Sequence, residues 1–112
     1  MDKLEKYQQI LQGIILRYAK LITSDDQILV VPICDAVRNE YLLMNVGWDE
    51  KEHRSHHIIF HFRLYNDKVY VEEDSTDVEI VRQLVEAGIP KEDIVLAFYP
   101  PSHRQITEFA FA

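Results

Sequence analysis

The stretch that decides the fold is residues 56–65, which read HHIIFHFRLY. From residue 58 onward its even-numbered positions are apolar, and its odd-numbered positions are mostly polar, which is the period of a half-buried β-strand. Asn66-Asp67 separates this strand from a second strand-like run over residues 68–72, so we expect a tight hairpin. We expect the even-numbered set to face the core: Ile58, Phe60, Phe62 and Leu64.

Two further strand-like runs precede this hairpin, over residues 28–35 and 41–48. Short polar breaks join the four runs, which favours antiparallel pairing because parallel neighbours need long crossover connections. Cys34 lies in the first run, so we expect its thiol to be buried and inert. The centre of the chain is therefore predicted to form a four-stranded, mainly antiparallel sheet.

Helical periodicity is found on both sides of the strands. Residues 2–22 carry apolar side chains three or four positions apart, and Asp2 with Glu5 resembles a capping box. A second apolar stripe over residues 78–85 ends before Gly88, which is typical of the residue after a helix. Residues 94–101 predict an extended carboxyl-terminal segment. The predicted fold class is α+β, with an N-terminal helix, the sheet, a second helix and this extended segment, in a single domain over residues 1–112.

Composition limits the class of function. The 112 residues include 12 Lys and Arg against 19 Asp and Glu, which gives a formal net charge of −7. This balance argues against a free-standing nucleic-acid binder, because phosphate neutralisation needs clustered basic side chains. The charged, periodic first residues are unlike a secretory leader, and no apolar run reaches the roughly 20 residues of a membrane span. We expect a cytoplasmic protein with no membrane contact and no cofactor.

Two sets of residues raise the question of a metal site. His57 and His61 lie four residues apart, roughly 13 Å along a strand, which is too far for one zinc ion. Asp35, Asp49 and Lys51 form the enzymatic alternative, a metal-dependent nuclease, because Mg²⁺ takes oxygen ligands and a lysine can stabilise charge. A solvated, charged turn explains these three residues better, so no catalytic and no metal-binding residue is assigned.

The carboxyl-terminal third carries the predicted binding site. It combines adjacent aromatic side chains, a stiff pair of prolines and an arginine, and aromatic residues and arginine are enriched at the centres of protein interfaces. The alternative is that the phenylalanines close the core, and both interpretations can hold together. The predicted partner-binding residues are Phe98, Tyr99, Pro100, Pro101, Arg104, Phe109 and Phe111.

The same region resembles a known family. Residues 88–101, which read GIPKEDIVLAFYPP, together with Arg104 and residues 107–110, closely resemble the XisI family, the fdxN element excision controlling factor proteins of cyanobacteria. Residues 1–7, 46–48 and 56–64 fit the same pattern, so the resemblance covers essentially the whole chain.

The resemblance implies a small α+β domain that has no assigned catalytic residue. It also implies an association with programmed DNA excision beside a site-specific recombinase, and a partner protein, XisH, that is suspected to be nuclease-like. We therefore expect a non-enzymatic accessory or controlling factor that binds an XisH-like partner and associates with DNA and the recombinase indirectly. A homodimer is compatible with this expectation and with the nuclease alternative.

Overall fold

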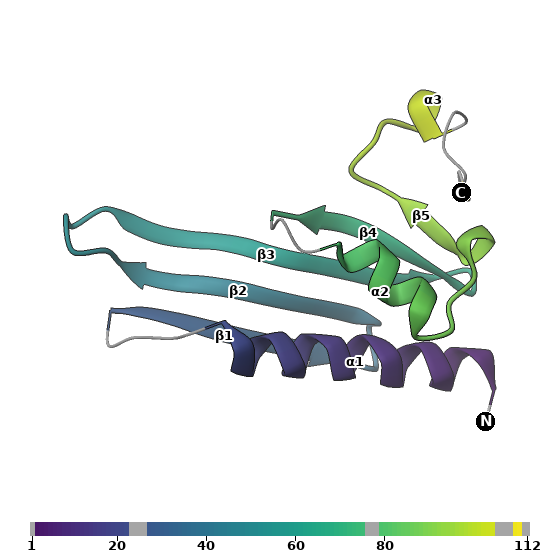
Figure 1. Ribbon diagram of the computed structural model, residues 1–112, viewed down its shortest axis with the longest axis horizontal. Helices are drawn as coiled ribbons and strands as arrows, with labels where there is room; N and C mark the ends of the chain where they lie inside the picture. Colours follow the sequence, from purple (N-terminus) through teal and green to yellow (C-terminus); the bar gives the residue numbers. More distant parts are fainter. Residues whose placement is uncertain (1, 23–26, 76–78, 105–108, 111–112) are drawn as a thin grey trace.

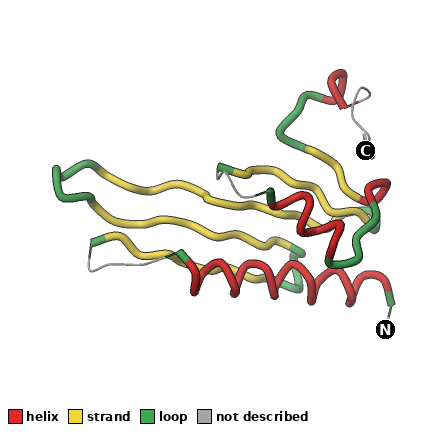
Figure 2. Tube along the Cα trace, viewed as in Figure 1, coloured by secondary structure: helices red, strands yellow, loops and turns green. Residues whose placement is uncertain are grey.

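A computed structural model describes residues 2–22, 27–75, 79–104 and 109–110 (Figure 1). The strands form one layer, and the two longer helices pack on it, whereas the short helix near the carboxyl end stands away from the sheet (Figure 2). No helix within these ranges is both long and apolar enough to cross a bilayer. In chain order, the elements are α1 (Lys3–Leu21), β1 (Ile28–Asp35), β2 (Glu40–Trp48), β3 (Arg54–Tyr65), β4 (Lys68–Asp74), α2 (Ile80–Glu86), the 3₁₀ turn η1 (Lys91–Asp93), β5 (Ile94–Leu96) and α3 (Pro101–Arg104).

The predicted α+β fold is confirmed, but the sheet has five strands, in the order β1-β2-β3-β4-β5. The first four strands pair antiparallel, as expected. The fifth strand pairs parallel to β4, with Val69 opposite Ile94 and Val71 opposite Leu96. Helix α2 lies between β4 and β5 in the sequence and provides the crossover that a parallel pair requires. The sheet is therefore mixed at this edge.

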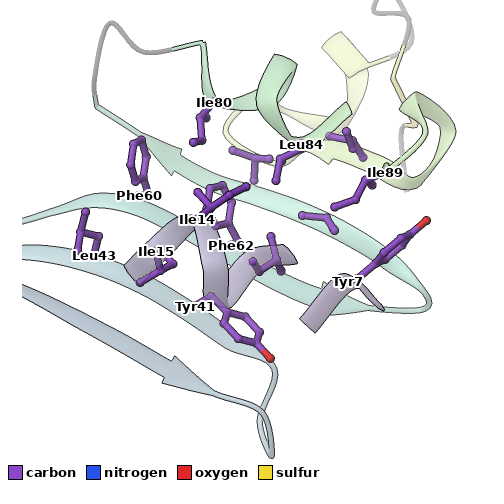
Figure 3. Packing of buried hydrophobic residues seen from close by; sticks show 14 of the residues in the cluster. Tyr7, Ile14, Ile15, Tyr41, Leu43, Phe60, Phe62, Ile80, Leu84 and Ile89 are labelled. Atoms are coloured by element: carbon purple, nitrogen blue, oxygen red, sulfur yellow. The ribbon is translucent and has the colours of Figure 1, made fainter. Parts of the chain in front are cut away.

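Helices α1 and α2 cover the same face of the sheet (Figure 1). The side chain of Asp2 accepts a hydrogen bond of 2.8 Å from the backbone N–H of Glu5, which confirms the predicted cap of α1. Tyr18 of α1 packs edge-on against Phe60, with ring centroids 5.4 Å apart. Figure 3 shows the core between the two helices and the strands, where Phe60 and Phe62 are fully buried.

The predicted alternation on β3 is interrupted by a β-bulge. Leu43 pairs with Phe60 and Met44 pairs with Ile58, so Ile59 is the extra residue on β3. As a result, Ile59 is buried in the core and is 4% exposed, whereas Ile58 lies opposite Met44 and is only partly buried. The expectation that Ile58 faces the core is wrong, because an extra residue reverses the side-chain alternation beyond it.

Two turns predicted from the sequence are confirmed. Asn66 and Asp67 both have positive φ angles, 52° and 60°, as a two-residue hairpin of the I′ type requires. Gly88 follows α2 with a φ of 115°, a conformation that glycine adopts without steric cost. The next residue, Ile89, is fully buried and donates a backbone hydrogen bond of 3.0 Å to the carbonyl of Leu84.

Two other expectations are corrected. Pro100-Pro101 does not continue an extended segment, because the short helix α3 begins at Pro101 and the backbone N–H of His103 donates to the carbonyl of Pro100 at 2.9 Å. Proline is tolerated at the first position of a helix because its missing N–H would have no partner in the helix. Cys34 is exposed rather than buried, because β1 is an edge strand of the sheet.

A charged contact attaches α1 to the turn that precedes β5. The hydroxyl of Tyr7 donates to Oδ2 of Asp93 at 2.5 Å, and Nζ of Lys3 lies 2.8 Å from the same oxygen. Burial raises the pKa of Asp93, but the hydrogen bonds from Lys3 and Tyr7 outweigh it and hold the pKa below its ordinary value. Lys6 adds a hydrogen bond of 3.2 Å to the carbonyl of Gly88.

We expect Asp93→Asn to lower the free energy of unfolding at neutral pH by about 1–2 kcal/mol, because hydrogen bonds to a charged group are lost. Since the folded-state pKa of Asp93 lies below its ordinary 3.8, the carboxylate stabilises the fold above that pH. The stabilisation is lost as the pH falls through the folded-state pKa. Urea denaturation across this pH range measures the difference, with the neighbouring exposed Glu92→Gln as control. A difference that does not shrink under acid would contradict the charged contact.

Gly47 and Gly13 differ in the space available for a side chain. A Cβ atom on Gly47 of β2 would lie 1.8 Å from the backbone oxygen of Gln27, at the start of β1. That oxygen also accepts a hydrogen bond of 2.9 Å from the backbone N–H of Trp48, so the two segments cannot separate without losing it. A Cβ atom on Gly13 of α1 would meet no described atom within 4 Å.

We expect Gly47→Ala to destabilise the protein by about 2–3 kcal/mol, because the added methyl forces β1 away from β2. Gly13→Ala should instead stabilise it by about 0.5–1 kcal/mol, since alanine favours a helix over glycine. Chemical denaturation of both variants measures the contrast. Unchanged stability of Gly47→Ala would show that the backbones do not approach this closely.

Candidate partner-binding surface

Strand β5 fixes the carboxyl-terminal segment in the core. Ile94 and Val95 are fully buried, and Leu96 is 8% exposed. Beyond the strand, the backbone N–H of Ala97 donates to the carbonyl of Val71 at 2.9 Å. The chain returns beside β5, where the N–H of Ala110 donates to the carbonyl of Ile94 at 2.9 Å. The described parts of the segment before and after α3 are therefore both attached to the sheet.

A pair of adjacent aromatic side chains stands out from this segment. The rings of Phe98 and Tyr99 lie 4.8 Å apart between centroids, at an interplanar angle of 49°. Phe98 is 46% exposed and Tyr99 is 42% exposed. The backbone N–H of Tyr99 donates to the carbonyl of Leu96 at 3.1 Å, so a turn directs the chain away from the strand here. Pro100 and Pro101, which follow, are exposed as well.

A groove of 530 Å³ lies between α2 and this segment. Charged side chains also line it, and among them Arg82 pairs with Glu79 at 2.7 Å. Apolar side chains of α2, β5 and the carboxyl-terminal segment form most of its wall: Ile80, Val81, Val85, Leu96, Phe98 and Phe109. The α2 residues are not among the predicted partner-binding residues, although the spacing of Val81 and Val85 on one helical face was a usable signal.

The predicted partner-binding residues differ in how exposed they are and in whether the structure describes them. Phe98 and Tyr99 are exposed together, whereas Phe109 is half-buried and packs against the core. Arg104 ends α3, and its side chain is outside the described part of the structure. Phe111 lies outside the described residues. We call the residues of the set that the structure describes the C-terminal surface: Phe98, Tyr99, Pro100, Pro101 and Phe109.

The carboxylates of the nuclease alternative are not brought together. Asp35 accepts hydrogen bonds of 3.0 Å from the backbone N–H of Arg38 and of its neighbour, and those from Arg38 lower its pKa. Asp49 accepts backbone hydrogen bonds from Lys51 at 2.8 Å and from His53 at 2.9 Å. The two carboxylates flank opposite ends of β2, about 30 Å apart by the rise of a strand. Both therefore stabilise turns, and one metal ion cannot bind both.

The described residues contain no group of three His, Cys, Asp or Glu side chains that could hold a metal ion. His61 instead lies 2.7 Å from a carboxylate oxygen of Glu40, whose second oxygen accepts a hydrogen bond of 2.9 Å from Arg63. Burial works to raise the pKa of Glu40, but these two partners hold it below its ordinary value.

Comparison with known proteins agrees with this architecture. The family model described as XisI protein matches residues 1–111. The crystal structure of a XisI-like protein from Anabaena variabilis is 36% identical, with a TM-score of 0.93, covering 97% of this chain and 99% of that chain. The structure of the fdxN element excision controlling factor XisI from the same organism is 44% identical, with a TM-score of 0.88, covering 99% of this chain and 100% of that chain. A comparison with curated proteins finds no match. From its match over nearly its whole length, the chain belongs to the XisI family.

Proposed function

We propose that this chain is a non-enzymatic controlling factor for the programmed excision of a DNA element, and that it acts by binding an XisH-like protein through its C-terminal surface. Family membership supports the controlling role, because a solved relative is named as an excision controlling factor. The partner supplies the contact with DNA and with the recombinase, so the association of this chain with DNA is indirect.

One observation carries the proposal, namely the exposed pair of Phe98 and Tyr99 beside an apolar groove. Each ring leaves roughly 100 Å² of apolar area in water, and covering that area is worth about 2 kcal/mol per ring. Because β5 fixes the preceding backbone, little ordering of the chain is needed when a partner binds. Rigid, partly exposed aromatic side chains are the type of residue that dominates binding energy in protein interfaces.

The charge of the chain supports the indirect contact with DNA. A formal net charge of −7 repels a phosphate backbone, whereas it attracts a basic partner and speeds its association. A nuclease-like protein that binds DNA needs basic groups on its DNA-facing surface. The two proteins are therefore expected to complement each other in charge.

We expect Phe98→Ala and Tyr99→Ala each to weaken binding to the XisH-like protein at least about tenfold, because each removes an apolar anchor. Isothermal titration calorimetry with the purified partner measures the dissociation constant. Leu21→Ala serves as the matched control, since Leu21 is 65% exposed at the end of α1 and lies outside the surface. If both aromatic variants fold and bind as tightly as the wild type, the proposed surface is wrong.

We expect the purified chain to cleave no DNA in the presence of Mg²⁺ or Mn²⁺. The physical reason is the separation of Asp35 and Asp49, which leaves no shared position for a catalytic metal ion. Incubation with linear and supercoiled DNA, followed by gel electrophoresis, tests this expectation. Metal-dependent cleavage that disappears in Asp49→Ala would support the nuclease instead.

A further inference from the structure

The sheet has a second face that no described helix covers. Helices α1 and α2 share one buried cluster with the strands, and strand alternation directs the other side chains to the opposite face. Leu29 lies opposite Val46 across β1 and β2, and Met44 lies opposite Ile58 across β2 and β3. We call the apolar side chains on this side the open face: Leu29, Val31, Ile33, Leu42, Met44, Val46 and Ile58.

The open face is unusually apolar for a surface in contact with water. Leu29 is 54% exposed, Ile33 is 39% exposed, and the other members are partly buried. An antiparallel sheet that faces water on one side normally alternates to polar residues there. A contiguous apolar patch that spans three strands is a mark of an interaction surface.

The charged side chains on this side of the sheet lie at the two ends of the open face and contact partners in the same chain. At one end, Arg54 lies 5.3 Å above the ring of Trp48. At the other end, the guanidinium of Arg63 lies 2.9 Å from a carboxylate oxygen of Glu40 and 3.7 Å from one of Glu72. Trp48 and Glu40 each lie four residues from the central Met44 along β2. The apolar open face therefore lies between two charged ends, as the apolar centre of a protein interface lies within a polar rim.

The size of the face suits a dimer. Four strands at about 4.8 Å spacing and the nine residues of β2 give a flat outline of roughly 600 Å². The relief of the side chains increases this area towards the about 800 Å² that each partner buries in a standard interface. This outline also includes Glu40, His61 and Arg63, which are paired with one another, so contact does not leave these charges without a partner.

We propose that two copies of the chain pack through their open faces, sheet against sheet, as a two-fold symmetric dimer. The two sheets then form a sandwich of the kind in which aligned sheets bury their apolar faces against each other. The C-terminal surface lies at the β5 edge of the sheet and is left free for another protein (Figure 1).

Analytical ultracentrifugation of the isolated chain tests the proposal. We expect a species with the mass of two chains, and we expect Ile33→Lys to raise the dimer dissociation constant at least about tenfold, because it places a charge in the interface. Leu16→Lys is the matched control, since Leu16 is 41% exposed on α1 and Ile33 is 39% exposed. This control should form the dimer like the wild type. Thermal unfolding of both variants confirms that they are folded.

A second variant tests the position of the axis. In a Cys34→Ser background, Met44→Cys should give covalent dimers with a short thiol cross-linker, because the two Met44 positions face each other across the axis. Val37→Cys, in the turn after β1, should cross-link much less, and equal cross-linking of the two variants would contradict this position of the axis.

Three results would overturn the proposal. One is a monomer at every concentration, and another is a dimer that Ile33→Lys leaves intact. The third is a monomeric chain in which Ile33→Lys abolishes binding to the XisH-like protein, because the open face then holds that partner. None of these results depends on Phe98 or Tyr99, so the dimer and the C-terminal surface can fail separately.

Discussion

The packing of α1 across one face of the sheet is the interaction on which the rest of the structure depends. Tyr18 and its neighbours on α1 meet the fully buried Phe60 and Phe62, and these side chains remove a large apolar area from water. The same contact gives the sheet two unlike faces. Side chains on the covered face form the core. Apolar side chains on the open face have no helix over them and stay partly exposed to water.

The second consequence of this packing concerns the position of the C-terminal surface. The N-terminal end of α1 contacts Asp93 through Lys3 and Tyr7. Asp93 is the last residue before β5, so this contact sets where the fifth strand begins. The exposed aromatic pair follows β5 directly. The N-terminal helix therefore positions the proposed binding surface, which lies about ninety residues away in the sequence, although the helix contributes no residue to that surface.

Much of the fold was predictable because its signals are local. The period of residues 56–65 identified β3, and Asn66-Asp67 identified its hairpin. The bulge at Ile59 was not predictable, because it depends on how two strands align and leaves no mark on the alternation. Strand β5 was missed as a sheet member for a similar reason, since three residues show too little period and their partner is more than twenty residues away.

The distinction between local and long-range signals applies equally to the proposed binding surface. The aromatic pair could be identified from its composition, but the groove beside it exists only because α2 crosses from β4 to β5. The two exposed surfaces also differ in symmetry. The open face is arranged evenly about Met44, which suits an identical copy, because a two-fold interface brings the same patch from both sides. The C-terminal surface has aromatic rings on one side and an apolar groove on the other, an uneven shape that suits a different protein. A chain with both surfaces can form a dimer and still present two separate sites to its partner.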